Sequence, residues 1–542
     1  MQVTNGATMN RPLRFSVLAG ALGAEPWQIK AMDSASETNF SENIGTFSVN
    51  ETEFLPGSTS VETPRNYDTK DPPDNKLTCV INDGEIGLTG DSWRRLLEGE
   101  PDLILNFTGH RLHLPEAISL PLGEWFFSSA YGPKISLRRL GEVELLEANG
   151  ATSLYLVAQT ANGINVLREG HFKTYPKPAR TRSVATKTAQ QWIRQSCQEV
   201  FSGSKSSFSE PESFKWRELP AGRNAKWRLL WKKLQGRLRE QIRYRFFRQQ
   251  WTIGVAESAI ADVSGCAGAG IQEAALRAIK WLPEQYGTFL ADPFGYLDKD
   301  LRLNILAEVY DWGRRIGEIC HLTYDRGLFS NRRLVLDSPY HLSYPFVFNL
   351  DGKTLFAPEH SQARDFSAFA IEQDGKIISK RTIMGKMVPV IDGTLLAYAG
   401  TYWLFASDEK ISSNTDLNIY FADSVEGPWQ AHPMNPVKSD VRSARPAGTP
   451  FFFEEELYRP GQDCSSHYGR AITINKIDLL TRTSYKESRS AAVLPTDPRY
   501  GYGLHTIAKV GERTLVDGAR LEPLVPLLSN LMAKLSGLSL KS

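Results

Sequence analysis

The stretch YPFVFNLDGKTLFAPE, residues 344–359, places two runs of β-forming residues on either side of the dipeptide Asp351-Gly352. Asp-Gly between such runs is a strong signal for a two-residue hairpin turn, because both central positions of that turn need a positive φ. The second run ends in a Pro-Glu pair, so the carboxylate of Glu359 comes at the edge of a strand. The stretch therefore predicts an antiparallel hairpin with an acidic side chain at its end.

The same unit recurs on both sides of this hairpin. Similar short runs occupy residues 289–297, 303–311, 366–379, 395–408, 417–429, 446–463, 469–478 and 503–518. Many short strands at near-regular spacing are typical of a sandwich, a barrel or a propeller. The repeated order of strand, short turn and strand ending in a carboxylate or an aromatic residue favours an all-β propeller over residues 251–520.

The first 200 residues have a different pattern. LRFSVLAG, residues 13–20, predicts a buried strand, and a helix is expected over residues 25–35. Another strand is expected over residues 135–140, and strands that alternate with helices indicate an α/β domain. The segment 33–76 is rich in Ser, Thr, Asn, Glu and Pro, so we expect a loop or a disordered insert there.

The bulk properties exclude several classes of protein. At 542 residues the chain is longer than one hydrophobic core usually supports, so a multidomain protein is expected. A net charge of +2 gives no reason to expect a nucleic-acid partner. Five scattered cysteines without a CxxC pair indicate reduced thiols in a cytoplasmic protein, and neither a disulfide framework nor a metal site is expected.

Residues 215–248 form a strongly basic segment with twelve Lys or Arg against Glu218 and Glu240. Apolar side chains recur there at spacings of three and four, namely Trp227, Trp231, Leu234, Leu238, Ile242 and Phe246. This pattern predicts an amphipathic linker helix within residues 201–250. Its apolar stripe would either pack on the propeller or attach the protein peripherally to an anionic membrane or a phosphorylated partner. The last residues, 521–542, are expected to form a helix and tail.

Seven motifs follow one another in a set order in the C-terminal half. They are FLADPF (289–294), YPFVF (344–348), APEHS (357–361), IDGTLLAYAGTYWLF (391–405), LNIYFADSVEGPW (417–429), ARPAG (444–448) and LYRPGQDCS (457–465). Together they resemble the N-terminal domain of plant glucosamine inositolphosphorylceramide transferase and its bacterial relatives. That domain is similar to the five-bladed propellers of arabinanase- and xylosidase-type glycosidases. The resemblance implies a five-bladed propeller that handles a carbohydrate.

Three acidic residues are the candidate catalytic groups. Asp292, Glu359 and Asp392 each come at a strand edge beside Pro or Gly. Converging in a central funnel, they would supply a base or nucleophile, a proton donor and a pKa-setting neighbour. The resemblance implies that Asp292 is the general base and that Asp392 orients and tunes the acid. Whether Glu359 is the acid stays open, because the glycosidase acid comes from a later blade, and Asp beside Pro or Gly also caps turns.

The candidate ligand-binding residues follow in the later motifs. The region of the fourth blade has no obvious lone Glu and carries Arg445, Arg459 and Gln462 instead. A guanidinium binds carboxylate or phosphate groups well, so the expected ligand is an anionic sugar or a sugar phosphate. His505 and Tyr344 complete the set. We therefore expect a carbohydrate-active protein of glycosidase or glycosyl-transfer type, with a non-catalytic glycan-binding or scaffold propeller as the alternative.

The N-terminal part carries a second resemblance. Its motifs are LRFSVLAGALGAEPWQIKAM (13–32), PDLILNFTG (101–109), GEWFFSSAYGP (123–133), ISLRRLGE (135–142) and ANGINVLREGHFKT (161–174). They resemble a degraded formyltransferase domain, an α/β fold that uses a folate formyl donor and an Asn-His-Asp set. The family's His-x-Ser-Leu-Leu-Pro loop is absent, and Asn106, His110 and His113 are the candidate remnants. A folate cofactor is therefore not expected, and formyl transfer to an amino sugar is a third alternative.

Overall fold

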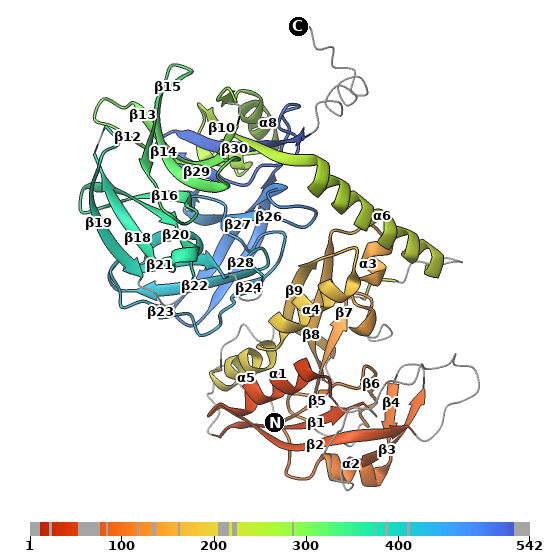
Figure 1. The fold of residues 1–542 in the computed structure, drawn as a ribbon. Coiled ribbons are helices and arrows are strands. Elements are labelled where there is room, and N and C mark those ends of the chain that lie inside the picture. Colours follow the sequence, from red (N-terminus) through yellow and green to blue (C-terminus); the bar gives the residue numbers. More distant parts are fainter. Residues whose placement is uncertain are drawn as a thin grey trace. The chain divides into compact units, whose positions relative to one another are not determined.

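The structure is a computed structural model. It describes residues 11–20, 24–51, 76–82, 85–115, 118, 120–132, 137–160, 163–203, 216–218, 225–284, 287–372, 374–384, 389–408 and 412–524. The chain divides into two compact units, residues 1–232 and 233–542, and each is described by itself (Figure 1).

The first unit is built on one nine-stranded mixed sheet. In sheet order the strands are β6 (Arg111–Leu112), β4 (Glu85–Leu88), β3 (Lys76–Asn82), β2 (Ser41–Glu51), β1 (Leu13–Ala19), β5 (Leu103–Asn106), β7 (Glu124–Ser129), β8 (Ala151–Thr160) and β9 (Gly163–Lys173). The central strand β1 pairs in parallel with both of its neighbours, whereas β7, β8 and β9 are successively antiparallel.

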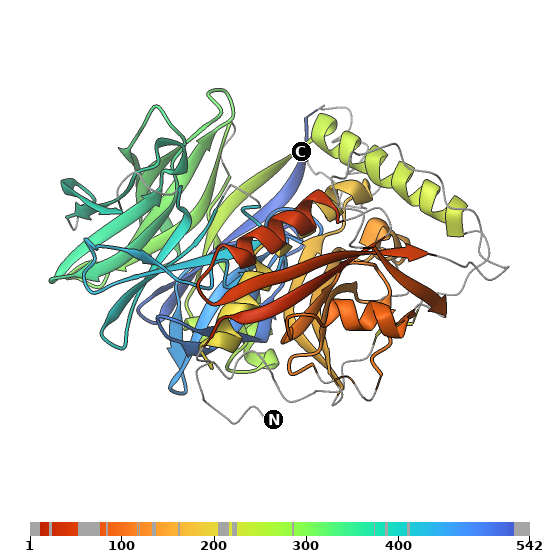
Figure 2. The same cartoon turned by 90° about the horizontal axis from the view of Figure 1, so that it is seen from below.

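Helices cover both faces of this sheet. They are α1 (Pro26–Ser36), α4 (Pro178–Ala189) and α5 (Trp192–Phe201) on one face and α2 (Gly90–Leu96) on the other, with α3 (Glu142–Leu146) and the short 3-10 helix η2 (Leu137–Arg139) nearer one edge. Successive strand residues point to opposite faces. Accordingly Val17 packs with α1 and α5, and its neighbour Leu18 packs with Trp93 of α2. Figure 2 shows α1 (red) and α2 (orange) on opposite sides of the strands. The α/β prediction is confirmed as a mixed α/β sheet.

Two predictions in this unit are wrong. The expected insert over residues 33–76 contains the end of α1 and the strand β2, which pairs with β1 along its length. Its polar composition concealed the strand, which contributes to the core only the buried Val49 and the partly buried Phe47; residues 52–75 lie outside the described part. The expected strand at 135–140 is the 3-10 helix η2, and residues 133–136 are not described.

The second unit contains five antiparallel sheets, which Figure 1 shows in succession around a common centre. Blade 1 is β12 (Thr288–Leu297), β13 (Leu303–Asp311), β14 (Ile316–Asp325) and β15 (Leu328–Leu336); blade 2 is β16 (Ser343–Leu350), β17 (Lys353–Glu359), β18 (Phe366–Ile371) and β19 (Ile377–Met384); blade 3 is β20 (Ile391–Tyr398), β21 (Thr401–Ser407), β22 (Asp416–Ala422) and β23 (Gln430–Ala431), with β24 (Lys438–Ser439) also on β22; blade 4 is β25 (Phe451–Phe453), β26 (Glu456–Asp463), β27 (Ala471–Leu480) and β28 (Tyr485–Val493).

Blade 5 joins the two ends of the unit and closes the ring. It takes β29 (Ile507–Val510) and β30 (Arg513–Pro523) from the end of the unit, and β10 (Phe247–Ala256) and β11 (Lys280–Trp281) from its beginning. β10 pairs antiparallel with β30 from Phe247 to Ala256. Two short helices, α7 (Ile260–Ser264) and α8 (Ala269–Arg277), connect β10 to β11. The predicted five-bladed propeller is therefore confirmed, with strands from residue 247 to residue 523.

The innermost strands of blades 1 to 3 share one irregularity. Each has a register shift near its start, between Ala291 and Phe294 in blade 1 and at matching places in blades 2 and 3. The residue with positive φ at these bulges is Asp292 (50°), Tyr344 (44°) or Asp392 (50°). A bulge bends its strand and redirects a side chain. The same β-bulge is thus repeated in three blades, at the Asp-Pro, Tyr-Pro and Asp-Gly dipeptides of the motifs.

The basic linker is the helix α6 (Ala225–Phe246). It is shorter than the expected 215–248, because Phe247 and Arg248 already belong to β10, and residues 219–224 are not described. Its apolar stripe is exposed, so the interpretation in which that stripe packs on the propeller is wrong. Among the helices that the structure describes, none is both long and apolar enough to cross a membrane. Of the expected C-terminal helix, residues 521–523 belong to β30, and residues 525–542 lie outside the described part.

Candidate functional site

The centre of the propeller receives one polar side chain from the inner edge of each blade. In chain order these are Asp292, Tyr344, Asp392, Arg445 and His505. The first three stand at the bulges, Arg445 precedes a bridge from Pro446 to Gly461 of β26, and His505 precedes β29. All five were predicted from the sequence as candidates, and hydrogen bonds connect them through their neighbours.

Asp292 lies at the junction of blades 1, 2 and 5. Its Oδ1 accepts a hydrogen bond from Thr506 Oγ1 (2.6 Å) and lies 3.3 Å from His505 Nε2. Its Oδ2 accepts the backbone N–H of Tyr344 (3.2 Å). Burial raises the pKa of Asp292 to about 6, although the nearby His505 opposes this. The carboxylate is therefore ionised at neutral pH and is held from three sides.

His505 is clamped between two carboxylates. Its Nδ1 lies 2.6 Å from Oδ2 of Asp517 in β30, and Asp517 Oδ1 accepts the backbone N–H of His505 (2.8 Å). Burial lowers the pKa of His505, but Asp517 and Asp292 outweigh it and leave that pKa above its usual value. Asp517 was not predicted; the Asp-Gly pair within a β-rich run, like the one at Asp392, was the available signal.

These three residues also form the one group, among the described residues, whose His and carboxylate atoms all lie within 4.8 Å of one another in a way that suits a metal ion. No metal site was predicted from the sequence. One imidazole and two carboxylates are a ligand set that divalent metals accept. Against the effect of burial, the two carboxylates also raise the pKa of His505, which favours the protonated over the neutral imidazole.

Asp392 is fixed by two side chains from blade 4. Arg445 donates from Nε to Asp392 Oδ2 (2.6 Å) and from Nη2 to Oδ1 (3.2 Å), which is a two-pronged contact. Gln462 Nε2 donates to Asp392 Oδ2 (3.0 Å) and to the carbonyl of Pro446. The guanidinium of Arg445 also lies 5.1 Å from the ring centre of Tyr468. The side chain of Arg445 is 12% exposed and Tyr468 is partly exposed, so both are somewhat more accessible than the buried carboxyl groups.

Glu359 adjoins Asp392 directly. Its Oε2 accepts the backbone N–H of Asp392 (3.2 Å), and its Oε1 accepts the hydroxyl of Ser361 (2.9 Å). Burial raises the pKa of Glu359 to about 8, and the charge of Asp392 adds to that shift while Arg445 opposes it. Glu359 therefore carries a proton at neutral pH. It ends β17, the second strand of blade 2, at the strand edge that the Pro-Glu motif predicted.

A further buried acid was not predicted. Glu308 lies in β13, and its Oε1 is 3.5 Å from Nε2 of His341. Burial, followed by the charge of Asp292, raises the pKa of Glu308 well above its usual value. The signal in the sequence was a lone acid inside the apolar run LNILAEVYD, which a buried strand does not otherwise tolerate.

Tyr344, predicted to bind ligand, is instead a fully buried link between blades. Its hydroxyl shares a hydrogen bond with Thr394 Oγ1 (2.9 Å) and accepts the backbone N–H of Gly448 (2.7 Å). Gly448 has φ 130°, and a Cβ there would lie 1.7 Å from the carbonyl oxygen of Ile507. Only glycine fits this approach. Tyr344 thus ties blade 2 to blades 3 and 4 and has no surface left for a ligand.

Arg459 is the second correction to the predicted ligand set. Its side chain is 1% exposed and donates to both carboxylate oxygens of Glu487 (2.9 and 2.7 Å) and to the carbonyl of Ser443 (2.8 Å). Lys438 reaches the same carboxylate. Against the effect of burial, Arg459 and Lys438 lower the pKa of Glu487 to about 2. All of this guanidinium's contacts are to the protein, so Arg459 stabilises blade 4 and does not bind ligand.

The candidate residues of the first unit are not gathered into such a cluster. Asn106, at the end of β5, donates to Glu124 Oε1 and to the carbonyl of His110 (2.7 Å). Burial raises the pKa of Glu124 to about 7. The side chain of His113 is mostly exposed, 3.7 Å from Glu85. Asn106 therefore stabilises the turn after β5, which is a structural role.

The fold and the site define a class: a five-bladed β-propeller with a buried centre of carboxylates, one arginine and one histidine. Residues 282–500 match the family described as Glucosamine inositolphosphorylceramide transferase 1, N-terminal. The predicted resemblance of the C-terminal half to this family is confirmed.

The similar proteins cover the same region. Glucosamine inositolphosphorylceramide transferase 1 of Oryza sativa subsp. japonica is 37% identical over 207 residues, which are 37% of this chain and 27% of that protein. The protein of the same name from Arabidopsis thaliana is 33% identical over 207 residues, with the same coverage. The match thus spans 27% of the length of these relatives.

Among solved structures, Zg3597, a family 117 glycoside hydrolase of Zobellia galactanivorans, is 14% identical, with a TM-score of 0.32, over 44% of this chain and 87% of that chain. The five blades are established here by the order of the sheets. The formyltransferase resemblance of residues 1–200 stays a prediction.

Proposed function

We propose that the propeller binds a sugar or sugar phosphate at its centre and breaks or transfers a glycosidic bond there. The observation that carries this proposal is the meeting of three carboxyl groups from three successive blades, Asp292, Glu359 and Asp392, in one buried cluster. The name of the plant relatives, a transferase acting with glucosamine and an inositolphosphorylceramide, supports the carbohydrate class.

The two perturbed carboxyl groups have complementary protonation states. With a pKa of about 8, Glu359 holds a proton at neutral pH, and with a pKa of about 6, Asp292 has lost its own. Glu359 would give its proton to the leaving oxygen as the glycosidic C–O bond breaks. Asp292 would take a proton from the water or hydroxyl whose oxygen forms the new C–O bond. Asp392, held by Arg445, sets the charge beside the donor.

Arg445 and Tyr468 are the groups that an entering ligand would meet. They are partly exposed, with 12% for the side chain of Arg445, whereas the three carboxyl groups are buried. A phenol ring offers a sugar an apolar face, and a guanidinium offers a phosphate or carboxylate a charged fork. Because Arg445 is already paired with Asp392, an anionic ligand would share it with that carboxylate.

A non-catalytic propeller is the second candidate, and one observation favours it. Both oxygens of Asp292 accept hydrogen bonds from the protein, from Thr506 and from the backbone of Tyr344. A carboxylate held in this way can serve to join blades without reacting. In that case the centre would bind a glycan or organise the ring, with no turnover.

The test is a screen of glycans and nucleotide sugars for binding, together with chromogenic glycosides for turnover. It is repeated with Glu359→Gln, Asp292→Asn and, as control, Glu455→Gln in the exposed turn after β25. We expect Glu359→Gln to lower turnover by roughly 10²–10⁴ with binding retained, and the control to change neither. Turnover that survives in both site variants would refute the catalytic roles. Binding without turnover in the unmodified protein would establish the second candidate.

A further inference from the structure

The helix α6 presents an apolar face to solvent. Trp227 is 73% exposed and Trp231 59%, and the stripe continues through the exposed side chains of Leu234, Leu238 and Ile242. A soluble protein normally turns the apolar stripe of such a helix inward. In α6 the less exposed residues, such as Leu229, Gly236 and Arg243, lie on the opposite side.

The spacing of the stripe makes it a continuous surface. Its members follow one another at intervals of four, three, four and four residues, which places them along one side of an α-helix. With 22 residues the helix is about 33 Å long. A surface of this length and composition is a candidate interface rather than a set of scattered exposed residues.

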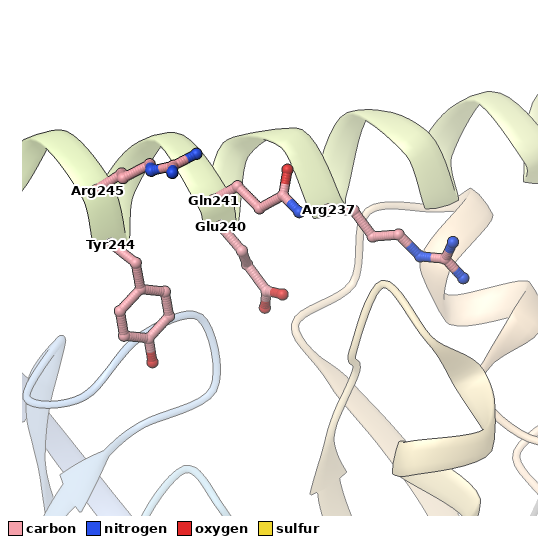
Figure 3. A pocket seen from close by; sticks show the side chains of 5 residues that line it. All are labelled: Arg237, Glu240, Gln241, Tyr244 and Arg245. Atoms are coloured by element: carbon pink, nitrogen blue, oxygen red, sulfur yellow. The ribbon is translucent and has the colours of Figure 1, made fainter.

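Charge along α6 is almost all of one sign. Eight cationic side chains stand against one carboxylate, Glu240, a balance of +7; they are Lys226, Arg228, Lys232, Lys233, Arg237, Arg239, Arg243 and Arg245. Figure 3 shows Arg237, Glu240 and Tyr244 extending from one flank of the helix, with Arg245 lying along it. Tyr244 is itself largely exposed, and an exposed tyrosine beside cations is typical of a membrane–water boundary.

We propose that α6 docks in the plane of an anionic lipid bilayer, with its tryptophan and leucine stripe in the acyl boundary and its cations at the lipid phosphates. Charge complementarity selects this occupant. A second copy of the chain would bring the same excess of positive charge to the interface, and like charges oppose such pairing. An anionic surface attracts every one of these cations.

The helix is attached firmly to the propeller, so that docking would hold the propeller at the membrane. β10 follows α6 without a break. Arg243 Nη1 donates to the hydroxyl of Tyr502 (3.0 Å), and the backbone N–H of Leu524 donates to the carbonyl of Phe246 (2.8 Å). This inference does not depend on the proposed chemistry of the propeller centre.

The test is co-sedimentation of the full chain with vesicles of phosphatidylcholine alone or of equimolar phosphatidylcholine and phosphatidylserine. The stripe variant is Leu234→Ser with Leu238→Ser. Its matched control is Leu301→Ser with Leu328→Ser, two similarly exposed leucines of blade 1. We expect binding to the anionic vesicles, a loss of at least about tenfold in the stripe variant and no loss in the control. The emission of Trp231, identified by difference from Trp231→Phe, should shift to the blue on binding.

Several results would overturn the proposal. The proposal fails if the full chain does not sediment with anionic vesicles. It also fails if substitution of either leucine pair reduces binding equally. Alternatively, salt abolishes binding while the stripe variant still binds, which would show attraction to a polyanion without insertion. A stripe-dependent dimer seen by sedimentation velocity, in a chain that ignores vesicles, would assign the face to a second copy.

Discussion

The propeller contains two buried clusters of charge in which the pKa of a carboxyl group is shifted in opposite directions. In blade 4, Glu487 is matched by Arg459 and Lys438, and its pKa falls to about 2. At the centre, Glu359 has Ser361 and one backbone N–H for partners, and its pKa rises to about 8. Burial pushes both values upward, so the difference lies in the compensating cations. A fully compensated carboxylate stabilises a fold, whereas an undercompensated one keeps a proton that chemistry can use.

The largest effect is expected from breaking the compensated cluster. Glu487→Gln leaves Arg459 buried beside a neutral amide, and an unpaired buried charge costs about 3–5 kcal/mol of unfolding free energy. Urea denaturation at neutral pH measures this loss. As a control, Arg381→Gln breaks an exposed pair with Glu426 and should cost at most about 1 kcal/mol. Equal losses in the two variants would mean that Glu487 is not the anchor of blade 4.

A smaller loss is expected at Tyr344, which links blade 2 to blades 3 and 4. Tyr344→Phe removes the hydroxyl that accepts the N–H of Gly448, and that buried donor then has no partner. The cost is about 1–3 kcal/mol, again measured by denaturation. Since Tyr344 is fully buried, ligand binding should survive the substitution. If ligand binding is lost in a variant of normal stability, Tyr344 belongs to the ligand-binding residues despite its burial.

The sequence predicted the ring of blades and much of the centre, because hairpin turns and the Asp-Pro and Asp-Gly motifs are local signals. It misassigned Arg459 because adjacency in a motif was given more weight than strand geometry. Arg459 and Gln462 are three residues apart on β26, and a period of two puts them on opposite faces. Gln462 therefore reaches Asp392, while Arg459 faces Glu487. Glu308 and Asp517 were not predicted, because the charged neighbours of a lone acid in an apolar strand come from strands that are distant in the sequence.

The smallest effect on the free energy of unfolding is expected from the matching Glu-to-Gln substitution at the propeller centre, Glu359→Gln. In the folded chain below pH 8 Glu359 is already neutral, so Glu359→Gln there exchanges one uncharged group for another of similar shape. The amide oxygen can accept the N–H of Asp392, and its NH₂ can donate to Ser361. Near pH 4, where the carboxyl is largely protonated in the unfolded chain too, we therefore expect almost no change in the free energy of unfolding, in contrast to Glu487→Gln.

The difference in the free energy of unfolding between Glu359→Gln and the unmodified chain should increase as the pH rises. Because the pKa of Glu359 is higher in the folded chain than in the unfolded one, its contribution is fully present at low pH and is lost as the pH climbs toward 8. Glu487 has a lowered pKa, so its contribution is present above its unfolded value and is lost as the pH falls toward 2. Melting temperatures across this range should show Glu359→Gln becoming progressively more stable than the unmodified chain as the pH rises from about 4 to 8, with no further gain above that. If the two melt alike at every pH, Glu359 is not protonated in the fold and cannot be the proton donor.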